Sequence, residues 1–176
     1  VKAIMGEIEH GGKLTLGHNA KIGYFSQNEA SLLDEKLTVF QTIDDVAKGD
    51  IRTKIKDILG AFMFGGEEWD KPVGGLSGGE RTRLAMIKLL LEPVNLLIVD
   101  EPTHHRDIRT KDILKQALLE FDGTLILVSH DRDFLDGLVH KIYEFGNKRV
   151  KEHDEGISEF LQRKKMEHLR ELEGKR

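Results

Sequence analysis

The chain has 176 residues, which suits one domain, or one domain with a terminal extension, and is long enough to bury a hydrophobic core. Its 27 Lys and Arg residues against 31 Asp and Glu residues give a formal net charge of -4, which excludes an overall positive field that would attract nucleic acid or an anionic membrane. The absence of cysteine excludes disulfides and thiolate metal sites. No apolar run reaches transmembrane length and the start is no signal peptide, so we expect a cytoplasmic protein without a membrane partner.

Two short strand-like runs come first, at residues 13–16 and 21–25, and a glycine-containing turn at 17–20 separates them. This spacing predicts a β-hairpin. Between residues 28 and 75 the apolar side chains recur at helical intervals, and the segment then becomes rich in glycine. We expect a small helical insert there.

A longer helix is predicted to begin after Leu76. Ser77 stands at the N-cap position and Glu80 follows three residues later, which is the pattern of a capping box. Apolar residues then recur on one face as far as Pro93, where the helix is expected to have ended.

Strands alternate with helices in the next part of the chain. Residues 96–99 and 124–128 are continuous apolar runs typical of buried strands, and residues 113–118 between them have a helical pattern. This alternation predicts an α/β fold with a parallel sheet. Three further elements are expected: a short helix near 131–137, a hairpin around 141–151 and a charged helix over 157–172.

Two acidic residues, Asp100 and Glu101, directly follow the first buried run, at the end of the strand where open α/β sheets bind their ligands. In phosphoryl transfer the first carboxylate of such a pair holds Mg²⁺ and the second polarises the attacking water. The plainer interpretation is that two acids start a solvated loop. The pair alone leaves both interpretations open.

Ser77, Gly78 and Gly79 open the capped helix. The glycines let backbone N–H groups approach an anion, the serine adds a hydroxyl, and the helix N-terminus has a partial positive charge. We interpret the three as a phosphate clasp, with an ordinary serine cap as the alternative. His130 follows the second buried run and could contact a γ-phosphate, and Gln27 follows the first strand and could touch Mg²⁺, although either residue alone is more often structural.

The order and spacing of these residues resemble an ATP-binding cassette domain of the ABC-F type, a soluble family that acts on ribosomes. Four segments carry the resemblance: residues 22–27 resemble the Q-loop, 76–80 the signature motif, 101–103 the stretch after Walker B, and 129–135 the H-loop. The resemblance implies ATP and Mg²⁺ as ligands. It also implies the site residues: Glu101 and His130 in catalysis, Gln27, Ser77, Gly78, Gly79 and Asp100 in nucleotide binding, Asp100 and Gln27 on Mg²⁺, and Asp107 in the D-loop.

The resemblance further implies the domain organisation. We expect a partial P-loop NTPase core, RecA-like with a parallel sheet, from residues 1–27 and 94–153. A helical subdomain over 28–93 would end in the signature helix, and a charged helix or tail would occupy 154–176.

The P-loop of the family is missing from this sequence. Residues 11–14 are the one tempting segment, but Glu7 occupies the required glycine position and Leu14 offers no hydroxyl to Mg²⁺. We therefore expect a fragment that begins after Walker A and that alone hydrolyses little or no ATP. A second cassette or an N-terminal half would complete the site, a homodimer is left open, and ribosomal RNA is the partner of the parent family. The alternative is a non-catalytic α/β scaffold, natural or engineered, that binds no nucleotide.

Two segments depart from the pattern of the family. His104, His105 and Arg106 place charge where the D-loop is usually apolar, and residues 154–158 lack the aromatic residues that usually flank Gly156. Solubilisation of exposed surfaces and ordinary drift explain these departures equally well. The two histidines lack a third ligand at a defined spacing, so a metal site is the weaker interpretation. Residues 163–165 are basic but lie among acids, which indicates a solvated helix face before an RNA-contacting arm.

Overall fold

The computed structural model describes residues 1–103 and 107–173 and contains two compact units, Val1–Val128 and Ser129–Arg176. The sheet of the first unit has the order β1-β2-β3, and both pairings are parallel. Its strands are β1 (Ile22–Ser26), β2 (Leu96–Asp100) and β3 (Thr124–Val128). The predicted α/β fold with a parallel sheet is therefore confirmed.

The central strand, β2, is paired on both sides. Leu97, Ile98 and Val99 are fully buried, as expected for a strand of a parallel sheet that is covered on both faces. The register pairs Asp100 with Ser26 on one side and with Val128 on the other, so the carboxyl ends of the three strands are level.

Strand β3 differs from its prediction. Its residues are half-buried or exposed, whereas the continuous apolar run predicted a fully buried strand. Strand β3 pairs with β2 alone and its apolar side chains stay partly exposed, whereas alternate residues of the other outer strand, β1, which packs against α3, are buried.

The predicted hairpin at the start of the chain is wrong. Residues 13–16, which the structure describes, form no strand, and β1 pairs in parallel with β2 instead. Leu14 and Leu16 remain exposed. Because a hairpin there would bury little apolar surface, nothing would offset the conformational entropy of ordering it.

Hydrogen bonds of Asn95 link the N-terminal ends of the three strands. Its Oδ1 accepts a hydrogen bond from the Lys21 N–H at 2.7 Å, and its Nδ2 donates to the Asn19 carbonyl at 2.8 Å. Its own carbonyl accepts the Thr124 N–H at 2.9 Å. Gly123 is required beside it, since a Cβ there would lie 2.6 Å from the same carbonyl oxygen.

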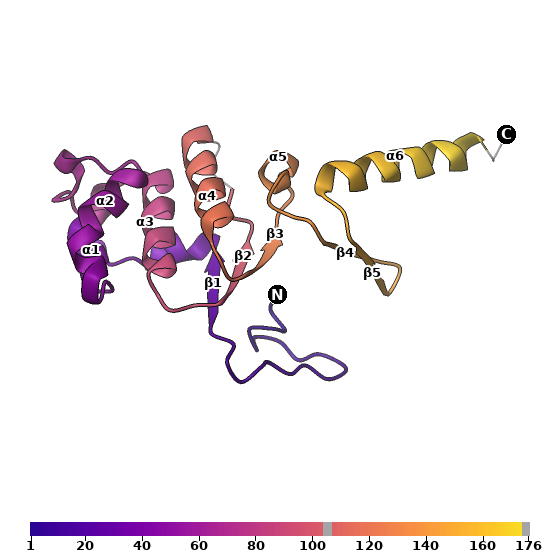
Figure 1. Ribbon diagram of the computed structural model, residues 1–176, viewed down its shortest axis with the longest axis horizontal. Helices are drawn as coiled ribbons and strands as arrows, with labels where there is room; N and C mark the ends of the chain where they lie inside the picture. Colours follow the sequence, from indigo (N-terminus) through magenta and orange to yellow (C-terminus); the bar gives the residue numbers. More distant parts are fainter. Residues whose placement is uncertain (104–106, 174–176) are drawn as a thin grey trace. The chain divides into compact units, whose positions relative to one another are not determined.

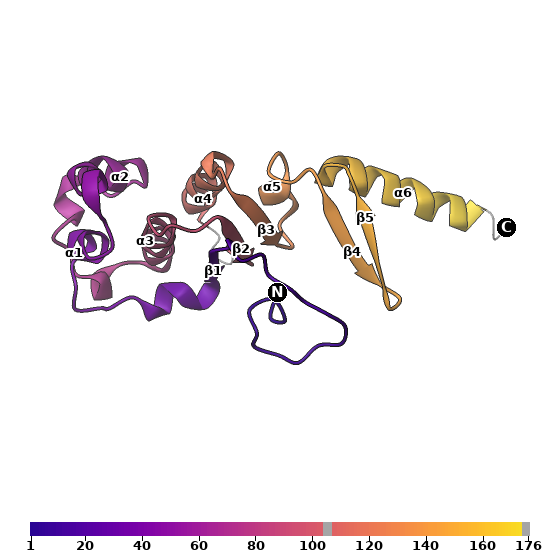
Figure 2. The same cartoon turned by 60° about the horizontal axis from the view of Figure 1, so that its bottom comes forward.

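The segment between β1 and β2 is helical, as predicted. It contains η1 (Gln27–Leu32), α1 (Val39–Asp44), η2 (Gly49–Lys54), α2 (Ile55–Ala61), η3 (Gly66–Glu68), η4 (Val73–Gly75) and α3 (Gly78–Leu90). In both views α3 lies between the α1–α2 pair and the sheet (Figures 1 and 2). These helices belong to the same compact unit as the sheet, and the boundaries of a separate helical subdomain stay a prediction.

Helix α4 (Ile108–Glu120) connects β2 to β3, the crossover that two parallel strands require. Leu114 and Leu118, four residues apart, are its buried apolar residues. Helix α4 also contacts α3, so the two helices pack side by side.

The second unit consists of α5 (Arg132–Leu135), an antiparallel hairpin of β4 (Ile142–Gly146) and β5 (Arg149–His153), and α6 (Ile157–Glu173). The predicted short helix, hairpin and charged helix are confirmed. Asn147 and Lys148 between the strands have φ values of 49° and 58°, as the two central residues of a type I′ turn require. Among the described residues no helix is both long and apolar enough to span a membrane.

Burial of β2 gives the first testable prediction. Leu97→Ala should lower the free energy of unfolding by about 2–5 kcal/mol, because it leaves a cavity in the centre of the sheet. Leu119→Ala, on the exposed side of α4, is the matched control and should change it by less than about 0.5 kcal/mol. Urea unfolding followed by circular dichroism measures both, and equal midpoints for the two variants would contradict the assignment of β2 as the core strand.

Candidate nucleotide-binding site

The acidic pair lies at the carboxyl end of the central strand. Asp100 is the last residue of β2, and Glu101 follows it with φ of 50°, the left-handed region that residues with a side chain adopt infrequently. The Glu101 N–H donates to the Val128 carbonyl at 2.8 Å, which holds this conformation against the end of β3. The chain therefore turns sharply between the two carboxylates, at the sheet edge where ligands of such folds bind.

Tyr24 of β1 lies beside Asp100. Its hydroxyl donates to Asp100 Oδ2 over a long 3.4 Å contact. Burial, followed by the negative charges of Asp100 and Glu7, raises the pKa of Tyr24 above its ordinary value. The phenol thus stays a neutral donor beside a carboxylate that is only half-buried.

Carboxylate oxygens are suitable ligands for Mg²⁺, so Asp100 fits that ion. Within residues 1–103 and 107–173, no cluster of three or more His, Asp or Glu side chains could hold a metal ion. This agrees with the usual coordination of Mg²⁺, in which one or two carboxylates act with water and substrate phosphates.

The N-terminus of α3 is built by a reciprocal cap. The Ser77 Oγ accepts the Glu80 N–H at 3.2 Å, and Glu80 Oε2 accepts the Ser77 N–H at 2.6 Å. Arg81 adds a hydrogen bond from its guanidinium to the Gly74 carbonyl at 3.0 Å. Ser77 and Gly78 are exposed, so the first N–H groups of the helix and the Ser77 hydroxyl face a region that a ligand can reach.

Gly79 packs against the start of α4. A Cβ at this position would lie 2.8 Å from Thr110 Oγ1 and 3.0 Å from Asp107 Oδ2. Asp107 is the N-cap of α4, where its Oδ1 accepts the Arg109 N–H at 3.1 Å. Glycine is therefore required here for contact between two helices as well as for any approach of a phosphate.

Arg83 completes this contact and was not found by sequence reasoning. Its side chain is 9% exposed, its Nη1 donates to Thr110 Oγ1 at 3.2 Å, and the same nitrogen lies 3.8 Å from Asp107 Oδ2. Thr110 in turn donates to Asp107 Oδ2 at 2.5 Å. The Thr110 hydrogen bond is the main cause, and Arg83 a smaller one, of a pKa of Asp107 below its ordinary value. The sequence offers one indication that Arg83 is buried, namely its position next to the apolar Leu84 on a helix with an inward-facing side.

The predicted residues fall into three groups. The structure brings Gly79 and Asp107 into contact and places Asp100 and Glu101 together at the sheet edge. Gln27 begins η1 directly after β1, and His130 is an exposed residue of the second unit. The functional roles of all these residues, and of Ser77 and Gly78, stay predictions. The departures at His104, His105 and Arg106, and the metal site considered there, lie outside the described residues.

A three-stranded parallel sheet, an acidic pair at the end of its central strand and a glycine-containing helix N-terminus define an α/β fold of the nucleotide-binding class. Residues 2–104 match the family model described as ABC transporter. The chain is 38% identical to the ABC transporter F family member 5 of Arabidopsis thaliana over 98% of its length, and 40% identical to the ATP-binding protein Uup of Haemophilus influenzae over 84%. It belongs to the ATP-binding cassette family and to its F type.

The chain spans about a quarter of the length of these curated relatives. Among solved structures it is similar to the ATP-binding cassette MJ0796, which was solved as a dimer in a post-hydrolysis state with ADP and Pi. The TM-score is 0.57 at 23% identity, over 77% of this chain and 63% of that one. This likeness supports the cassette fold.

The Gly79 contact gives the second testable prediction. Gly79→Ala should lower the free energy of unfolding by about 1–3 kcal/mol, because the new methyl group displaces Thr110 or Asp107 from a shared hydrogen bond. Gly60→Ala in α2 is the matched control, since its Cβ would meet nothing within 4 Å, and it should raise stability by about 0.5–1 kcal/mol. Thermal unfolding compares the two. A Gly79→Ala variant as stable as the parent would show that the helices are not packed as described.

Proposed function

We propose that this chain is the part of an F-type ATP-binding cassette that follows the P-loop, and that it serves in ATP binding and hydrolysis by a pair of cassettes. The observation that carries the proposal is the position of Asp100 and Glu101 at the carboxyl end of the buried central strand. The F-type assignment implies a cytoplasmic protein whose target is the ribosome. With a net charge of -4, the chain would contact ribosomal RNA only through local basic groups.

The sheet edge supplies the groups for hydrolysis. In this proposal Asp100 holds Mg²⁺, which neutralises phosphate charge when bound, and Glu101 polarises the attacking water. The half-buried position of both residues supports these roles, because a carboxylate at a partly desolvated edge interacts more strongly with a cation than one in bulk water. Gln27 and His130 would contact the Mg²⁺ and the γ-phosphate as the resemblance implies.

The capped helix supplies a second, separate function. The Ser77 Oγ already accepts the Glu80 N–H, so its own proton remains available to donate to a phosphate oxygen. The exposed Gly78 and the neighbouring Gly79 add N–H groups of the first helical turn. We assign this clasp to a nucleotide held by another cassette, and the dimeric state of MJ0796 supports such an arrangement.

The 176 residues contain no G-x-x-x-x-G-K-[ST] segment, so our proposal requires a P-loop outside them. Without one the carboxylates have no positioned phosphate to act on, and we expect no appreciable hydrolysis by the chain alone. The same observation favours the second candidate function, a scaffold that keeps the cassette fold and binds no nucleotide.

The test is a mixing experiment, which is the third prediction. ATP turnover by an F-type cassette that carries its own P-loop is measured with and without this chain in excess. We expect turnover to rise with the parent chain. Ser77→Ala should reduce this rise by about tenfold or more, because a hydrogen bond to a charged group contributes about 1.5–3 kcal/mol.

Ser31→Ala is the matched serine control, since Ser31 lies in η1 and its hydroxyl donates to the nearby Asn28 carbonyl at 2.6 Å. It should stimulate turnover as strongly as the parent chain does. Absence of stimulation, or equal stimulation by the Ser77 and Ser31 variants, would favour the scaffold. Turnover by this chain alone that requires Mg²⁺ and disappears in Glu101→Gln would overturn the proposed dependence on a second P-loop.

A further inference from the structure

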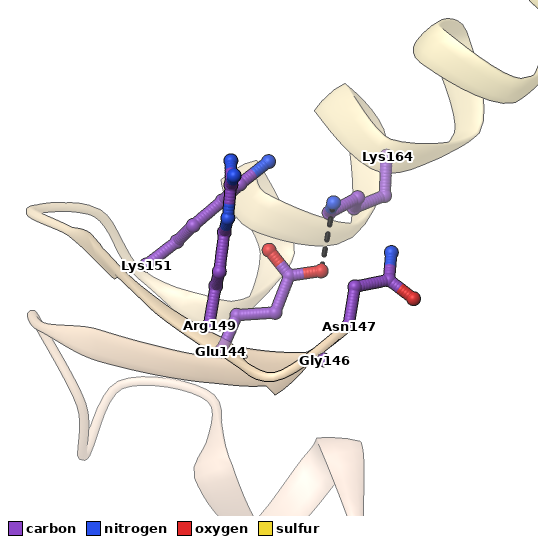
Figure 3. Close-up of a pocket in the computed structure, with 6 residues that line it drawn as sticks. All are labelled: Glu144, Gly146, Asn147, Arg149, Lys151 and Lys164. Atoms are coloured by element: carbon purple, nitrogen blue, oxygen red, sulfur yellow. Dashed lines mark ion pairs between the residues drawn. The ribbon is translucent and has the colours of Figure 1, made fainter.

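A polar cavity of about 400 Å³ lies in the second unit, against the β4–β5 hairpin and the first half of α6 (Figure 3). The residues that line it, in the part of the chain that the structure describes, are charged, polar or glycine. Its lining residues are Glu144, Gly146, Asn147, Arg149, Lys151 and Lys164. The charged groups therefore favour an occupant that is recognised by charge and hydrogen bonding.

The strand register gathers the charged residues on one face of the hairpin. Glu144 is paired with Lys151, and Gly146 with Arg149, so these positions share the face that also carries His153. His153 contacts α6, with its ring 5.2 Å from that of Phe160. In Figure 3, Arg149 and Lys151 reach from β5 toward the side on which Lys164 lies.

The one acid in the cavity is already neutralised. Glu144 accepts from Lys164 at 2.7 Å and contacts His153 Nε2 at 3.0 Å. These two contacts, Lys164 first, hold the pKa of Glu144 below its ordinary value. Glu144 therefore stays ionised, and it forms its ion pair with Lys164 of α6 rather than with its cross-strand neighbour Lys151.

Two cations remain without a counter-charge. Although Lys151 lies directly opposite Glu144, neither it nor Arg149 forms an ion pair with any residue that the structure describes. Both side chains are exposed. With Lys164, the cavity has three positive groups against one negative group, so its net charge is opposite in sign to that of the whole chain.

Contacts outside the cavity join α6 to the end of β5. Arg163 Nε donates to Glu155 Oε1 at 3.1 Å, and its Nη2 lies 3.0 Å from His153 Nδ1. These contacts fix α6 against the end of β5. The type I′ turn at Asn147 and Lys148 sets the hairpin register, which places the backbone positions of Arg149 and Lys151 on the same face.

We propose that this cavity is a phosphate-binding site, in which Arg149 and Lys151 make the principal contacts and the Asn147 amide adds a hydrogen-bond donor. The planar guanidinium of Arg149 matches two phosphate oxygens, and Lys151 adds a point charge beside it. A phosphate group offers oxygens to both cations at once, which suits a guanidinium and an ammonium group that lie side by side. The phosphate can come from a small anion or from an RNA backbone.

Binding of two probes by the full chain distinguishes these sources, which is the fourth prediction. Calorimetry measures inorganic pyrophosphate, and fluorescence anisotropy measures a labelled oligouridylate of about 12 nucleotides, long enough to cross one local site. The double variant Arg149→Gln/Lys151→Gln should weaken binding about tenfold or more, since it removes charge-assisted hydrogen bonds. For RNA, the salt dependence should also fall by about 0.7 in slope for each phosphate that the variant no longer neutralises.

The matched control is Lys165→Gln/Arg170→Gln, which removes the same charge from α6 outside the cavity. It should keep both affinities within about threefold, as expected for exposed charges screened by salt. Selective weakening for both probes, or for pyrophosphate alone or RNA alone, supports the site and identifies its source. Absence of binding by either probe, or equal weakening by the two double variants, overturns it. Neither result depends on the clasp at Ser77.

Discussion

The backbone pairing of β2 on both sides is the constraint on which the first unit depends. Strands β1 and β3 satisfy the two edges of β2, and this pairing allows Leu97, Ile98 and Val99 to be fully buried without unpaired backbone groups. The same register brings the carboxyl ends of the three strands level. Asp100 and Glu101 therefore occupy the sheet edge as a direct consequence of how the core is formed, and Glu101 takes its left-handed conformation where its N–H meets the end of β3.

A second network connects α3 to the residues that follow the acidic pair. Arg83 and Thr110 hold Asp107 at the N-terminus of α4, and Gly79 packs onto the same two side chains of α4. The charge of Arg83 is buried but offset by Asp107 at 3.8 Å and by the Phe64 ring at 5.3 Å. These contacts join the N-terminal part of α3 directly to the beginning of α4.

The elements predicted correctly from the sequence are those in which the hydrophobic or capping pattern matches the burial and contacts seen in the structure. The run at 96–99 is apolar and central, the capping box at Ser77 and Glu80 is a local signal, and both are present in the structure. Residues 13–16 alternate as a strand would but have no surface to cover, and the run at 124–128 is apolar but lies at an edge. Whether these two segments are buried depends on which other segments pack against them in the folded chain. The role of Arg83 was hidden for the same reason, because a buried arginine is recognisable only once its partners on α4 are known.

Some of the candidate site residues also stabilise the fold, and this affects how substitutions at these positions should be interpreted. The Ser77 hydroxyl caps α3 through the Glu80 N–H, and this structural function is independent of the phosphate contact that we propose. Gly79 likewise serves helix packing whether or not a phosphate binds. Reduced turnover on changing either residue therefore reports on nucleotide binding only when stability is measured in the same variant. Asp100 is the N-cap of none of the helices that the structure describes, and its hydrogen bond with Tyr24 is long, so a substitution there tests the proposed chemistry with less structural side effect.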